Sequence, residues 1–106
     1  MDAFIISRID LYCDWINKGK PCACEAIQDR YVNETAQRIK SKNRLQVYIE
    51  NLAPGWKTVW AYKEDYMLEI IKSLPEKPKT VFDHWVLGKA FGYSDEAIKN
   101  FLETKL

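Results

Sequence analysis

Residues 44–62, RLQVYIENLAPGWKTVWAY, decide the fold of this chain of 106 residues. Apolar and polar residues alternate over 45–50, and a second alternating run spans 56–62. A period of two residues places successive side chains on opposite faces of an extended strand. The dipeptide Pro54-Gly55 between the two runs is typical of a turn, so the stretch predicts a β-hairpin.

The residues before the hairpin predict two helices and a further strand. Apolar spacing of three and four residues predicts a helix over about 3–18 that ends at Gly19, and another over about 30–41 with Asp29 as its N-cap. Between them, CACEAI at 22–27 is a short run of small and apolar residues, which favours a buried strand. Together with the hairpin, these segments predict a β-α-β-β unit preceded by a helix.

Three more helices are predicted after the hairpin. We expect Asp65 to cap the first, which Pro75 ends, and the second to begin with a capping box at 80–83. Ser94 is expected to cap the third. The expected fold class is therefore α+β, with an N-terminal helix, a small three-stranded sheet and three C-terminal helices in a single globular domain over 1–106.

The composition excludes several function classes. Sixteen basic and fifteen acidic residues leave a net charge of +1, which gives no global attraction to nucleic acid or to an anionic membrane. No apolar run is long enough to span a membrane, and Asp2 stands where a signal peptide carries positive charge. Three cysteines without a signal peptide indicate reduced thiols, so we expect a cytoplasmic location and no membrane partner.

The cysteines raise the question of a metal or thiol site, since Cys13, Cys22, Cys24 and His84 are ligand types found at zinc sites. In a strand, Cys22 and Cys24 would lie on one face about 6.6–7 Å apart, whereas two sulfurs on one zinc ion are at most about 4.6 Å apart. We therefore expect the cysteines to be core residues and keep the zinc site as an alternative. No catalytic triad, carboxylate pair or phosphate loop is evident, so we expect neither catalysis nor a cofactor.

The aromatic residues of the hairpin are expected to share one face of the sheet. Because the amphipathic helices need an apolar surface to pack against, we expect them to cover this face. If it is exposed, it offers contact residues, because Trp and Tyr dominate interface hot spots. We expect a small regulatory or accessory protein that acts by protein–protein interaction, and the candidate contact residues are Tyr48, Trp56, Trp60, Tyr62 and Tyr93.

Nucleic-acid binding is the alternative function and is less favoured; it would use either the aromatic face of the hairpin, on which bases could stack, or the C-terminal helix pair. The candidate phosphate contacts in and near QRIKSKNR are Arg38, Lys40, Lys42, Arg44 and Lys57. The residues LGKAFGYSDEAI at 87–98 resemble the turn region of helix-turn-helix repressors, and FGYSDEAI resembles the turn of ubiquitin-associated three-helix modules. The first resemblance implies DNA contacts at the start of the second helix. Asp95 and Glu96 occupy those positions here and would repel phosphate.

Overall fold

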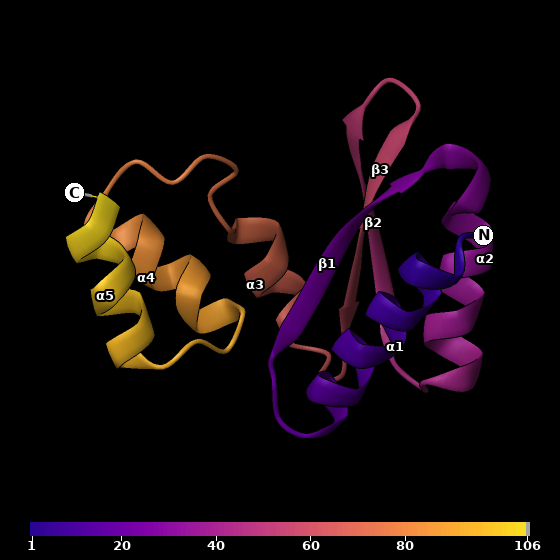
Figure 1. Ribbon diagram of the computed structural model, residues 1–106, viewed down its shortest axis with the longest axis horizontal. Helices are drawn as coiled ribbons and strands as arrows, with labels where there is room; N and C mark the ends of the chain where they lie inside the picture. The colour runs from indigo at the N-terminus through magenta and orange to yellow at the C-terminus, as the bar shows by residue number, and fades with distance from the viewer. Residues whose placement is uncertain (106) are drawn as a thin grey trace.

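The computed structural model describes residues 1–105 and confirms the α+β class (Figure 1). A 3₁₀ turn (η1) and a π-helical turn (η2) flank the second helix. The elements in chain order are α1 Ala3–Asn17, β1 Cys22–Gln28, η1 Asp29–Tyr31, α2 Val32–Gln37, η2 Arg38–Lys42, β2 Gln46–Ala53, β3 Trp56–Tyr62, α3 Met67–Ser73, α4 Val81–Ala90 and α5 Asp95–Lys105. None of the described helices has the length and apolar composition needed to cross a membrane.

The sheet has the strand order β1-β3-β2, and both of its strand pairs are antiparallel. The predicted hairpin is formed by β2 and β3, and Gly55 adopts a φ of 82° in its turn. The return strand β3 therefore lies in the centre, where Trp60 pairs with Cys24 on one side and Tyr48 on the other. The strand predicted at 22–27 is an edge strand.

Two hydrophobic clusters cover the two faces of the sheet. Figure 1 shows α1 and α2 on one face, α3 on the other, and α4 and α5 beyond α3. Alternation along β3 sends Val59 and Ala61 to the α1–α2 side and Trp60 and Tyr62 to the α3 side. The α1–α2 cluster consists of Ile9, Cys13, Ile16, Ala23, Ile27, Val32, Ile39, Leu45, Val59 and Ala61, and the α3 cluster of Cys22, Trp60, Tyr62, Met67, Ile71 and Ala90.

Two of the predicted helix caps are wrong. Asp29 is the first residue of the η1 turn and caps no helix, because Gln28 is the N-cap of η1 and Tyr31 that of α2; its carboxylate pairs with Lys57 Nζ at 3.4 Å. The Asp65 side chain accepts a hydrogen bond from Gln46 Nε2 at 2.6 Å and caps no helix. In both cases a partner from the neighbouring hairpin takes the carboxylate, so a tertiary contact overrides the local preference.

Candidate functional site

Helices α4 and α5 form a hairpin whose start follows from its sequence. Thr80 Oγ1 accepts a hydrogen bond from the Asp83 backbone N–H at 3.0 Å, and Asp83 Oδ2 accepts one from the Thr80 backbone N–H at 3.3 Å. This is the predicted capping box, and it satisfies two backbone donors that the first turn leaves free. The backbone N–H groups of Lys79 and Thr80 hold the pKa of Asp83 below its usual value.

The turn between α4 and α5 is a Schellman motif. The Tyr93 N–H donates to the Gly88 carbonyl at 2.9 Å, and the Gly92 N–H donates to the Lys89 carbonyl at 3.1 Å. The motif needs a left-handed residue, and Gly92 supplies it with a φ of 82°. Ser94 then caps α5 as predicted, because its Oγ accepts from the Ala97 N–H at 3.1 Å. The chain therefore reverses within a few residues and brings α5 back along α4.

The two helices approach closely at one point and leave an apolar groove beside it. A Cβ atom added to Gly88 would lie 2.6 Å from Ile98 Cγ1, so only glycine allows this spacing. The rings of His84 and Phe101 lie 5.4 Å apart along the groove. The groove has a volume of about 430 Å³ and is lined by Pro78, His84, Leu87, Gly88, Phe91, Tyr93, Ala97, Ile98 and Phe101.

The C-terminal end of α4 fixes the helix pair against the sheet. Phe91 stacks on Trp60 with 5.8 Å between ring centroids and 9° between ring planes. The buried thiol of Cys22 donates to the Ala90 carbonyl at 3.2 Å. A Cβ atom on Gly92 would lie 3.1 Å from Pro21, which shows how closely the turn packs on the start of β1. The groove is therefore held in place by contacts between residues far apart in sequence.

A lysine connects the turn to α1. Lys20 Nζ lies 5.5 Å from the ring centroid of Trp15 and 5.6 Å from that of Tyr93. Both rings are largely exposed, so each cation–π contact contributes about 0.5–1 kcal/mol. This contact places a positive charge at the Tyr93 end of the groove.

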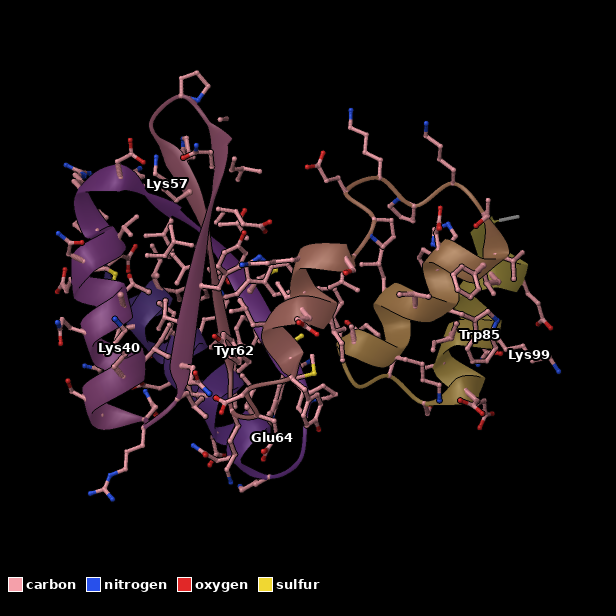
Figure 2. The ribbon with its side chains drawn as sticks, turned by 180° about the vertical axis from the view of Figure 1, so that it is seen from behind. Lys40, Lys57, Tyr62, Glu64, Trp85 and Lys99 are labelled. Atoms are coloured by element: carbon pink, nitrogen blue, oxygen red, sulfur yellow. The ribbon has the colours of Figure 1, made fainter. Side chains whose placement is uncertain are left out.

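Charge is distributed unequally on the two sides of α5. Among the described residues, no carboxylate lines the apolar groove. A helix advances 100° per residue, which places Asp95, Glu96 and Glu103 on the side of α5 opposite to Ala97 and Phe101. These three acidic residues line a separate cavity together with Trp85, Lys99 and Asn100. Figure 2 shows Trp85 and Lys99 on the helix pair, away from the sheet.

The structure separates the predicted aromatic contact residues into buried and exposed ones. Trp60 and Tyr62 are only 7% and 4% exposed, because α3 and the end of α4 cover them (Figure 2). Trp60 also donates its Nε1–H to Glu50 at 2.6 Å. Tyr48 is half-buried beside Lys72, and Trp56 is exposed next to the hairpin turn. Only Tyr93, which is 57% exposed, lines the groove. The expectation that helices cover this face is confirmed for Trp60 and Tyr62, which are core residues.

Most of the predicted phosphate contacts are engaged with carboxylates. Arg38 donates to both oxygens of Asp10, at 2.9 and 2.7 Å, and Lys42 contacts the same carboxylate at 3.0 Å. Lys57 pairs with an aspartate in η1. Lys40 and Arg44 are exposed, and Arg44 has a φ of 57°. The five basic residues therefore form no continuous patch of free charge.

The predicted metal ligands are not brought together. Cys13 belongs to the cluster under α1 and α2, whereas Cys22 belongs to the cluster on the other face of the sheet. His84 lines the groove between α4 and α5. Within residues 1–105, no group of three or more His, Cys, Asp or Glu side chains could hold a metal ion. The zinc alternative is wrong for this set because the sheet separates two of its members.

The thiols are poorly suited to nucleophilic chemistry. Burial raises the pKa of Cys13 to about 11, that of Cys22 to about 12 and that of Cys24 to about 11. A thiol is nucleophilic only as the thiolate, and at neutral pH these thiols carry very little of it. The expectation that the cysteines are core residues is confirmed for Cys13 and Cys22, which are fully buried.

Of the groove residues, the sequence identified Tyr93 as a candidate contact residue and His84 as a candidate metal ligand, and one signal could have found the others. Helix α4 carries Val81, Phe82, Trp85, Val86 and Leu87, and these apolar residues are spread around the helix instead of forming one face. Such a helix is normally buried, yet Phe82 here is 74% exposed and Val81 is 51% exposed. The number of apolar residues in α4 therefore indicates that this helix exposes an apolar surface that the other described elements do not cover.

The comparisons with known proteins found no relative of this chain. No protein-family model matches the chain, no curated protein matches it significantly, and no solved structure does so.

Proposed function

We propose that the protein binds another protein through the groove between α4 and α5 and acts as a regulatory or accessory component. The observation that carries the proposal is the groove itself, an apolar hollow of about 430 Å³ that is open to solvent. Exposed apolar surfaces of monomers commonly mark interaction sites.

The position and rigidity of the groove support a binding role. Its floor is the close contact of Gly88 with Ile98, and its inner end is stacked on the sheet through Phe91. A preformed site loses little conformational entropy when a partner binds. Tyr93 and Phe101 flank it as exposed aromatic rings, which are suited to act as hot spots.

The test compares two exposed phenylalanines. Phe101→Gln removes an aromatic wall of the groove, and Phe4→Gln removes an equally apolar side chain from α1, remote from the groove. We expect proteins retained from a lysate by immobilised wild-type chain to be retained by Phe4→Gln and lost with Phe101→Gln. With a purified partner, calorimetry should show a loss of at least about tenfold in affinity, which corresponds to about 1.4 kcal/mol.

The two variants must be folded for the comparison to count. Phe4 is 74% exposed and Phe101 is 46% exposed, and neither is a core residue, so circular dichroism should show thermal midpoints close to that of the wild type. Retention of the same proteins by both variants would refute the groove as the contact surface.

A further inference from the structure

The apolar groove has a positive rim. Lys77 and Lys79 are both exposed and flank Pro78, which lines the groove. Neither lysine forms an ion pair within the described part of the chain. At the other end, the ammonium group of Lys20 lies 5.6 Å from the Tyr93 ring. Both ends of the groove therefore carry basic residues, and the acidic residues of α5 face away from it.

The groove also has the length of a short helix. Its walls are α4 and α5, which have 10 and 11 residues. At about 1.5 Å per residue, these walls are about 15 Å long, which matches about three helical turns of a bound segment. A helix that enters such a groove presents apolar anchors at positions i, i+3 or i+4, and i+7.

We propose that the partner segment is an acidic amphipathic helix, whose apolar face fills the groove and whose carboxylates meet Lys77 and Lys79. This inference rests on the proposed function and adds the chemistry of the partner to it. The charge arrangement selects against basic segments, because a positive flank would be placed against two lysines whose ammonium groups form no ion pair within residues 1–105. Helix α5 of a second copy is disfavoured as the occupant, because α5 is itself a wall of the groove and its acidic side is not apolar.

The test selects peptides without assuming a sequence. A displayed library of random 16-residue peptides is selected against the whole wild-type chain, and the selected peptides are sequenced and synthesised. We expect helical patterns of apolar residues with a net negative charge. The affinity of the synthetic peptide is then measured by calorimetry against four proteins, namely the wild type, Phe101→Gln, the double variant Lys77→Glu/Lys79→Glu, and Lys99→Glu.

The lysine variants isolate the charge contribution. Lys99 lies on the acidic side of α5, and Lys99→Glu is the control for a single Lys-to-Glu replacement, with half the charge change of the double variant. An exposed ion pair contributes about 0.2–1 kcal/mol, so the double variant should bind the peptide roughly 2- to 30-fold more weakly. Lys99→Glu should bind like the wild type. The difference between the wild type and the double variant should shrink at high salt because exposed charges are screened.

The outcomes separate this inference from the proposed function. Peptides that need Phe101 but show no acidic bias, or that bind the double variant as tightly as the wild type, would overturn the acidic partner and leave the groove as a binding site. Selected peptides that never depend on Phe101 would overturn both. Sedimentation that shows a dimer of the wild type and a monomer of Phe101→Gln would identify a second copy as the occupant and overturn the inference.

Discussion

Replacement of Gly88 by alanine is expected to destabilise the protein although alanine is the better helix former. Gly88 lies inside α4, where glycine costs about 1 kcal/mol relative to alanine. On propensity alone, Gly88→Ala would therefore be stabilising. The added Cβ would, however, lie 2.6 Å from Ile98 Cγ1 and 2.7 Å from Ile98 Cδ1. The optimal separation of two such carbons is about 3.5–4.0 Å, so one of the helices or the Ile98 side chain must move.

The balance of the two effects sets the expected magnitude. Insertion of a methyl group into a packed contact costs about 1–3 kcal/mol. The gain in helix propensity offsets about 1 kcal/mol of this cost. The free energy of unfolding should therefore fall by about 1 kcal/mol, with an upper value of about 2 kcal/mol. Ile98→Ala removes both clashing atoms and leaves Ile98 Cβ, which is 3.8 Å from the added atom and causes no clash. In that background Gly88→Ala should instead stabilise the protein by about 1 kcal/mol.

Urea unfolding at 25 °C, followed by tryptophan fluorescence and far-ultraviolet circular dichroism, measures these free energies. Ile98→Val is the matched control, because valine loses Cδ1 and keeps a carbon at the 2.6 Å position. Gly88→Ala should therefore remain destabilising in the Ile98→Val background. An effect of Gly88→Ala that is equal in all three backgrounds to within about 0.5 kcal/mol would refute the close contact as the reason for the glycine.

Three further results are expected. Asp10→Asn should lower the free energy of unfolding by about 1–3 kcal/mol in urea titrations, because Asp10 accepts hydrogen bonds from Arg38, Lys42 and Asn43. Arg38 holds the pKa of Asp10 below its unfolded value of about 3.9. The stabilisation is therefore complete above about pH 4 and is lost as the pH falls towards the lower pKa of the folded state. Equal acid sensitivity of the wild type and Asp10→Asn would contradict this account. Iodoacetamide at pH 7.5 should label the thiols slowly in the native protein and rapidly in urea, and fast labelling of the native protein would show a reactive thiol site. A chelator should leave the thermal midpoint of unfolding unchanged, and a shifted midpoint would show a metal site. Anisotropy titrations at about 50 mM salt should detect no tight binding of single-stranded or duplex DNA, because Arg38, Lys42 and Lys57 are paired with carboxylates. Binding that depends steeply on salt would restore the nucleic-acid alternative.

Much of the local structure could be predicted because it depends on neighbours in the sequence. The hairpin follows from two alternating runs around Pro54-Gly55, and the start of α4 from the spacing of Thr80 and Asp83. The caps at Asp29 and Asp65 could not be predicted, because each carboxylate pairs with a residue of the hairpin. A local sequence preference determines where a helix begins only if no residue distant in the sequence competes for the capping carboxylate.

The candidate site was harder to predict because its residues are brought together by contacts across the chain. Tyr93 was identified from its residue type and lies in the groove, whereas Trp60 and Tyr62 were identified in the same way and are buried. Sequence shows that a residue is aromatic and which strand face it occupies. It does not show which helix covers that face.

By itself the sequence determined the α+β class, the hairpin and the order of helices, since periodicity and turn residues act over a few positions. Only the tertiary structure decided which apolar surfaces are covered. The stacking of Phe91 on Trp60 and the bond from Cys22 to Ala90 place the end of α4 on the sheet, and α3 closes the aromatic face. The groove beside Gly88 stays open because, within residues 1–105, the remaining apolar side of α4 and α5 meets no further element.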